Sequence, residues 1–114
     1  MNPDTLFLRF GSDVRRDGGQ FFAAVTEPRF TGDRLALLTE TLDAVRNRCR
    51  EAGESFFIHF TEQDNGEMHF ASIRFSAHSR IEADLPALEA HAAQTDTYFR
   101  FAYSPGCARI NIAG

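Results

Sequence analysis

The chain has 114 residues, of which 43% are hydrophobic and 25% are charged, and its formal net charge is −4. These values are typical of one globular domain and exclude a disordered chain, so we expect a single α+β domain over residues 1–114. Every basic residue is an arginine, which excludes chemistry that needs a lysine. No apolar run is long enough for a membrane span, and the first residues do not resemble a signal peptide. We therefore expect a cytoplasmic protein that does not bind membranes.

The first 30 residues show apolar and polar residues in alternation. This pattern predicts strands over 5–10 and 21–26. Asp17-Gly18-Gly19 between them is a turn signal, so the region is interpreted as a first hairpin.

A helix is predicted next, between a capping signal at Thr31-Gly32-Asp33 and a glycine, Gly53, in the position that usually ends a helix. Its buried stripe repeats at helical spacing and consists of Leu35, Leu38, Leu42, Val45 and Cys49.

A second hairpin is predicted over 55–61 and 68–75, because Asn65-Gly66 favours a two-residue type I′ turn. That turn places residues whose numbers sum to 131 opposite one another. Phe56, Ile58 and Phe60 then share the core face with Phe75, Ile73 and Ala71. The same register makes Glu62 and His69 direct cross-strand partners.

A second helix is predicted from about Asp84, with Asp84 as its cap and Pro86 in its first turn. A third hairpin over 97–103 and 108–112 follows. The predicted fold is thus hairpin-helix-hairpin-helix-hairpin: an antiparallel sheet of five or six strands with two helices packed on one face.

The common catalytic and nucleotide-binding motifs are absent from the chain. Glu62 and His69 could form an acid/base pair, but His59 points to the other face of the strand, which argues against a three-ligand metal site. Cys49 and Cys107 are too few and too far apart to suggest a disulfide framework. We expect no cofactor, no metal and no enzyme activity, with a small acid/base enzyme using Glu62 and His69 as an alternative.

The most informative prediction concerns the sheet face away from the helices, where arginines alternate with aromatic residues. Such a composition is typical of interface hot spots. The candidate partner-binding residues are Arg9, Phe57, His59, Phe70, Arg74, Tyr98, Arg100 and Arg109.

Three interpretations of this face compete. Arginine stems could simply cover the aromatic rings. The face could instead bind a protein, either an acidic partner or a second copy in a homodimer. It could also bind single-stranded nucleic acid by stacking and phosphate contacts. Our working hypothesis is a small non-enzymatic binding or inhibitor protein that docks a protein partner. An antagonist from a phage or mobile element, such as an anti-CRISPR, would fit by analogy.

Overall fold

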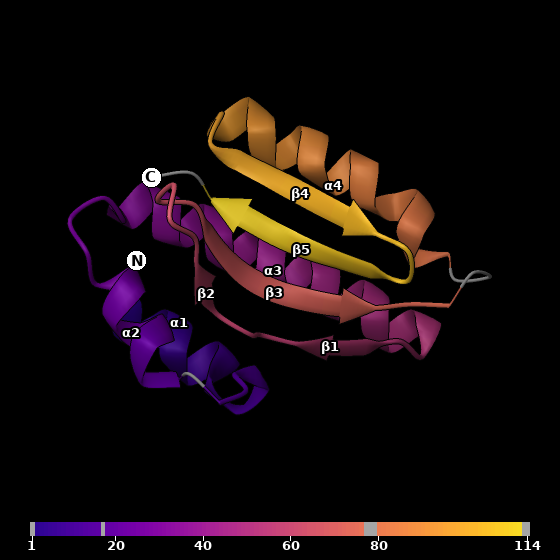
Figure 1. The fold of residues 1–114 in the computed structure, drawn as a ribbon, viewed down its shortest axis with the longest axis horizontal. Helices are drawn as coiled ribbons and strands as arrows, with labels where there is room; N and C mark the ends of the chain where they lie inside the picture. The colour runs from indigo at the N-terminus through magenta and orange to yellow at the C-terminus, as the bar shows by residue number, and fades with distance from the viewer. Residues whose placement is uncertain (1, 17, 77–79, 113–114) are drawn as a thin grey trace.

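Helices occupy most of the first half of the chain, and most of the strands lie in the second half together with a further helix, in the computed structural model, which describes residues 2–16, 18–76 and 80–112 (Figure 1). The helices are α1 (Pro3–Phe10), α2 (Gly18–Val25), α3 (Gly32–Ala52) and α4 (Ile81–Thr95), with a 3-10 turn at Gly11–Asp13. The strands are β1 (Ser55–Phe57), β2 (Thr61–Glu62), β3 (Met68–Arg74), β4 (Phe99–Ser104) and β5 (Cys107–Ile112).

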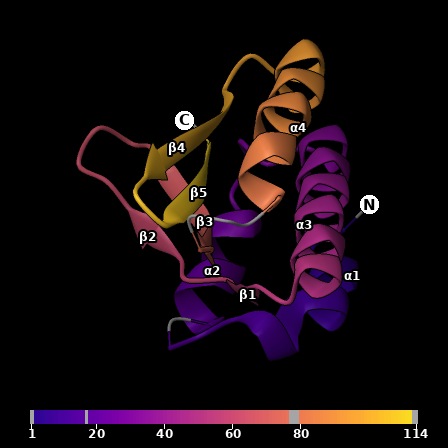
Figure 2. The same ribbon diagram turned by 90° about the vertical axis from the view of Figure 1, so that its right-hand side faces the viewer.

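The strands form one antiparallel sheet in the order β1-β3-β5-β4, and β2 also pairs with β3. Helices α3 and α4 lie side by side against one face of the sheet (Figure 2). Helices α1 and α2 lie together beside the β1–β2 edge (Figure 1). The fold is α+β with an antiparallel sheet, and the sheet face opposite α3 and α4 carries no helix among the described residues.

Helix α3 has the ends that its sequence predicts. The Thr31 side chain accepts a hydrogen bond from the Arg34 backbone N–H at 3.3 Å, which caps the first turn. Gly53 ends the helix with a φ of 69°, a left-handed conformation that glycine adopts without steric cost. Leu38 and Leu42 are fully buried. The prediction of this helix is confirmed.

The predicted first hairpin is wrong, because residues 5–10 belong to helix α1. Asn2 caps this helix by accepting the Thr5 backbone N–H at 3.0 Å, and Pro3 occupies its first turn. Leu6 and Phe10, four residues apart, face the core, while 88% of Leu8 is exposed. Leu8, the middle residue of the alternating apolar series, therefore lies on the solvent-exposed side of a helix and not in a strand.

Residues 21–26 are likewise helical up to Val25, and Gly18 and Gly19 begin helix α2 instead of forming a hairpin turn. Phe21, Ala24 and Val25 are buried at the i, i+3, i+4 spacing of one helix face. The error in the prediction arose because a single apolar helix turn and a short strand share much of the same pattern.

The second hairpin forms, but with a loop of three residues rather than two. Gln63 pairs with Glu67 at 2.8 Å, and the Gly66 N–H donates to the Gln63 carbonyl at 2.9 Å. Gly66 has a φ of 81° and Asn65 does not have a positive φ, so the turn is not of type I′. The extra loop residue shifts the register near the turn by one position.

Further from the turn the register is shifted by two positions, with Phe56 opposite Ile73. A two-residue shift preserves which side chains face the core. The predicted core face is therefore correct, since Ile58, Ala71 and Ile73 are buried. At Phe70, however, strand β3 carries a bulge, because His69 and Ala71 pair with the consecutive residues of β5.

The bulge turns Phe70 toward the helices. Phe70 is fully buried and its ring lies 5.4 to 5.7 Å from the rings of Phe21, Phe30 and Phe60. This aromatic cluster joins α2 and the segment before α3 to the sheet. The prediction that Phe70 belongs to the open face is wrong for this reason.

Helix α4 starts at Ile81 after Arg80, so Asp84 is not its cap and Pro86 lies inside the helix. The third hairpin has the predicted pairing, with Phe99 opposite Ile112 and Phe101 opposite Ile110. Among the described residues, the structure has no helix that combines the length and apolar character needed to cross a membrane.

Candidate functional site: a cationic groove on the helix-free face

Two adjoining hollows lie at the helix-free face, and together we call them the cationic groove. The larger has a volume of about 630 Å³ and is lined by Arg15, Arg16, Ser55, Phe56, Phe57, His59 and Arg74. The smaller has a volume of about 200 Å³ and is lined by His59, Thr61, His69, Ser72 and Arg109. His59 lines both, so the two hollows adjoin at this residue.

The loop that carries Arg15 and Arg16 is fixed to the edge of the sheet by the backbone. The Arg15 N–H donates to the Ile58 carbonyl at 2.8 Å, and the Ile58 N–H donates to the Asp13 carbonyl at 2.8 Å. Val14 and Ile58 thereby form a parallel bridge in the gap between β1 and β2. The loop extends the open face beyond β1 and holds two guanidinium groups there.

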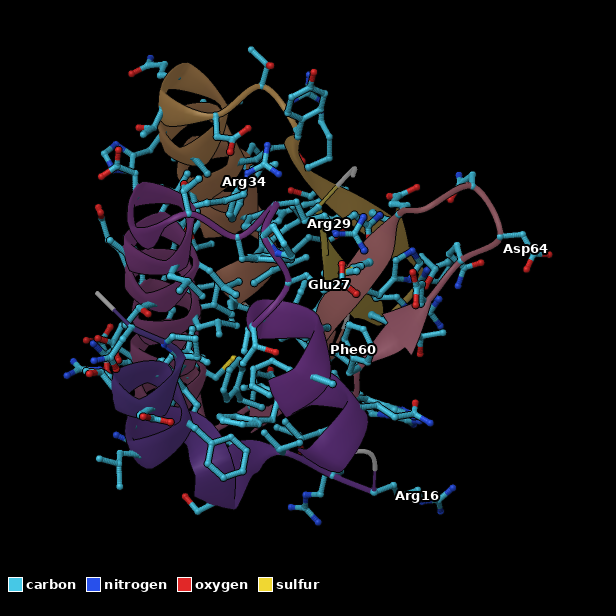
Figure 3. The ribbon with its side chains drawn as sticks, turned by 90° about the vertical axis from the view of Figure 1, so that its left-hand side faces the viewer. Arg16, Glu27, Arg29, Arg34, Phe60 and Asp64 are labelled. Carbon is cyan, nitrogen blue, oxygen red and sulfur yellow. The ribbon has the colours of Figure 1, made fainter. Side chains whose placement is uncertain are left out.

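Arg15 and Arg16 are held in different ways. The Arg15 guanidinium carbon lies 6.0 Å from the centre of the Phe57 ring, at the limit of a cation–π contact. Arg16 has a φ of 66°, a left-handed conformation that costs a residue with a side chain about 1 kcal/mol or more. Figure 3 shows Arg16 projecting outward from the loop before α2.

The strands supply the other cations of this face. Arg74 lies at the end of β3 opposite Ser55 and Cys107, and Arg109 lies on β5 opposite Ser72. Arg100 lies on β4 opposite Asn111, and it donates to the Phe99 carbonyl at 2.7 Å. Because strand pairing places directly opposite residues on one face, these arginines share the helix-free side.

His69 lines the smaller hollow and is the cross-strand partner of Asn111. The His69 side chain is 13% exposed, and its buried Nδ1 has no hydrogen-bond partner among the described residues; the same is true of Asn111 Oδ1. Burial lowers the pKa of His69 from 6.5, and Arg109 lowers it further against the opposing effect of Glu67. His69 is therefore uncharged near neutral pH, and the positive charge of the groove comes from the arginines.

No acidic residue lines either hollow within the described part of the chain. Five arginines away from the groove form ion pairs with described acids: Arg9, Arg29, Arg34, Arg46 and Arg48. In contrast, over residues 2–16, 18–76 and 80–112 no ion pair within 4 Å involves Arg15, Arg16, Arg74, Arg100 or Arg109. Positive charge is thus concentrated on one face of an acidic protein.

Five of the eight sequence-predicted residues lie on the helix-free side: Phe57, His59, Arg74, Arg100 and Arg109. Three do not. Arg9 lies on helix α1 and pairs with Asp43 of α3. Phe70 is in the core, and Tyr98 precedes β4, where its ring stacks 5.2 Å from the Arg34 guanidinium.

Arg15 and Arg16, which line the larger hollow, are not among the sequence-predicted residues. They lie between two segments that the sequence pattern predicts as strands, just before the predicted turn. Two adjacent arginines before a Gly-Gly pair were the available signal, but only the bridge to Ile58 shows that they reach the sheet.

The predicted Glu62–His69 pair does not form. In the observed register Glu62 is opposite Met68, and His69 is opposite Thr61. Met68 is buried toward the helices, and Glu62 lies 3.6 Å from Arg29 on that side. Figure 3 shows Arg29 and Glu27 beside these strands. The alternative of an acid/base enzyme required Glu62 and His69 to be cross-strand partners, and they are not.

The cysteines give no sign of nucleophilic chemistry. Both are free thiols. Burial raises the pKa of Cys49 to about 12, so this thiol is protonated at neutral pH and is a poor nucleophile. The described residues contain no cluster of three metal-ligating side chains.

Comparison with known proteins adds no homologue to this picture: no family model, no curated protein and no solved structure matches the chain.

Proposed function

We propose that the protein is a non-catalytic binding protein that docks an acidic segment of a protein partner in the cationic groove. The observation that carries this proposal is a contrast in ion pairing: the groove arginines have no acidic partner within 4 Å among the described residues, whereas Arg34, Arg46 and Arg48 of α3 each pair with an acid. Guanidinium groups bind carboxylates through two parallel N–H donors, which gives direction as well as charge.

The shape of the site supports a binding role. The bridge between Val14 and Ile58 fixes the Arg15 backbone before any partner arrives, and Arg74 and Arg109 project from hydrogen-bonded strands. A pre-organised surface loses less conformational entropy when it binds. Clustered like charges also repel one another, so this arrangement stabilises the protein less than paired arginines would.

Single-stranded nucleic acid is the weaker candidate for the same groove. Sheet proteins that bind single strands usually stack successive bases on several exposed aromatic rings. Here Phe70 is in the core, Tyr98 stacks against Arg34, and Phe57 is in contact with Arg15. Because these rings are buried or already in contact with arginines, the groove is better suited to a ligand that is recognised through its negative groups.

The first experiment measures binding of a fluorescein-labelled poly-glutamate peptide by fluorescence anisotropy at low salt. The proposal predicts saturable binding to the wild type and at least a tenfold loss in Arg74→Glu/Arg109→Glu, since two cations become anions. The matched control is Arg48→Glu/Arg50→Glu, the same charge change on α3, which should retain most of the binding. Equal losses in both variants would show attraction by net charge alone and contradict the proposal.

Two further measurements separate the alternatives. An oligothymidylate that binds more tightly than the peptide, and that loses affinity in Phe57→Ala, would favour the nucleic-acid function. Light scattering tests for the homodimer: a wild-type dimer that Arg74→Glu/Arg109→Glu converts to monomers would make the groove a self-interface.

A further inference from the structure

We infer that the Arg15–Arg16–Arg74 end of the groove is a site for a phosphate monoester, namely a phosphorylated side chain on the protein partner. This inference rests on the proposed function, because it specifies the group that the groove binds. It concerns the larger hollow alone, which these three arginines line.

The charge of the larger hollow is the first argument. Three guanidinium groups share about 630 Å³ with no acidic side chain in the described lining. A carboxylate supplies one negative charge, whereas a phosphate monoester supplies about 1.5 to 2 at neutral pH. One phosphorylated side chain therefore neutralises this end of the groove better than one aspartate or glutamate.

The donors form the second argument. Each guanidinium carries several N–H donors in a planar fork that matches two oxygens of a phosphate group, and the Ser55 hydroxyl adds another donor. A phosphate monoester offers three terminal oxygens, each able to accept more than one hydrogen bond. The lining donors come from the 13–16 loop, from β1 and from β3, so three structural elements supply donors to the one hollow.

The aromatic wall is the third argument. Phe56 and Phe57 line the same hollow, and both are partly buried. A free inorganic phosphate has no carbon to place against a ring, whereas a phosphorylated side chain brings apolar atoms next to its anion. This combination of arginines and rings points to a phosphate attached to a side chain rather than to a free ion.

Arg16 is consistent with this assignment. Its positive φ is one that glycine adopts without strain, whereas an arginine there destabilises the backbone. A function of the side chain would explain why an arginine is present. The guanidinium supplies one, since a glycine at this position would relieve the strain but remove a cation from the hollow.

The test compares two fluorescent peptides of equal net charge by anisotropy. One carries a single phosphoserine in a short glutamate-containing sequence, and the other carries two adjacent aspartates in its place. The inference predicts about tenfold tighter binding of the phosphopeptide, since the geometry of its oxygens differs while the charge does not. Arg74→Lys, which keeps the charge but loses the fork, should abolish that preference without preventing binding.

The outcomes separate this inference from the proposed function. Equal affinity for both peptides would overturn the phosphate site and leave the acidic-segment function intact. Failure of both peptides to bind would overturn both. Competition by inorganic phosphate at the concentration at which the phosphopeptide binds would overturn the assignment to an attached side chain.

Discussion

Arg34 on the helix side of the molecule and Arg74 on the open face carry the same guanidinium in opposite surroundings. The Arg34 side chain is 15% exposed, donates to both oxygens of Asp96 at 2.7 and 3.4 Å, and stacks on Tyr98. Arg74 is exposed beside a hollow and has no acidic partner within 4 Å among the described residues. Arg34 is therefore committed to holding helix α3 to the start of β4, whereas Arg74 remains able to bind an external anion.

The comparison extends to the two groups of arginines. Arg46, like Arg34, joins two elements: it donates to Asp13 at 3.1 Å and to Asp43 at 2.9 Å, and it lies 4.5 Å from the Phe10 ring. Removing such a residue deprives a partly buried acid of an ion-pair partner, whereas removing Arg15 or Arg74 breaks no ion pair among the described residues. Stability and binding should thus depend on different arginines.

The largest expected effect contrasts two phenylalanines that the sequence placed on one face. Phe70→Ala should lower the free energy of unfolding by about 3–5 kcal/mol, because it empties the centre of the ring cluster. Phe57→Ala, beside the groove, should cost less than about 1 kcal/mol. Urea unfolding followed by circular dichroism measures both. Similar losses would mean that Phe57 belongs to the core.

The next effect contrasts two arginines. Arg46→Ala should cost about 1–3 kcal/mol, because Asp13 loses its ion-pair partner and Asp43 keeps only Arg9, in a site where Arg46 is 13% exposed. Arg74→Ala should change stability by no more than about 0.5 kcal/mol. The same unfolding measurement checks the pair, and a destabilised Arg74→Ala would contradict the separation of roles.

Arg16 gives a smaller effect with the opposite sign. Arg16→Gly should stabilise the protein by up to about 1 kcal/mol, since glycine adopts a φ of 66° without strain. Arg16→Ala removes the same charge but keeps the strain, so its stability should stay near that of the wild type. If both variants behave alike, the backbone at Arg16 is not strained.

The smallest effect is a pH dependence from His69. Because burial lowers its pKa in the folded protein, the unfolded chain takes up the proton first as the pH falls below about 6.5. His69 therefore reduces stability on the acid side and has no such effect above that range. His69→Gln should lose less stability than the wild type between about pH 7.5 and pH 5. An unchanged pH profile would contradict this.

The sequence predicted helix α3 and the β4–β5 pairing well, because several local signals in each agree with one another. Helix α3 has its cap, its stripe and its terminal glycine in one consistent series, and the pairing of β4 with β5 follows from alternating residues on both strands. The core faces of β1 and of β3 beyond its bulge were also predictable, because a register shift of two residues leaves them unchanged.

The wrong predictions arose where the local sequence pattern fits both a helix and a strand. Leu6, Leu8 and Phe10 fit a strand as well as a helix, and only the Asn2 cap and the packing of α1 on α3 decide between them. Arg15 and Arg16 were thereby missed as groove residues, since their loop reaches Ile58 at the sheet edge only because α1 and α2 replace a hairpin. The bulge at Phe70 has no marker in the sequence at all.

Amide NMR spectra of the protein, recorded while the acidic peptide is added, locate the binding site directly. We expect peak shifts on titration to cluster at the groove, around Arg15, Phe57, Arg74 and Arg109, while the amides of α3 and α4 stay in place. Shifts centred on Arg34 and Arg46 of α3 would contradict the proposal, because binding would then occur where the arginines already pair with acids.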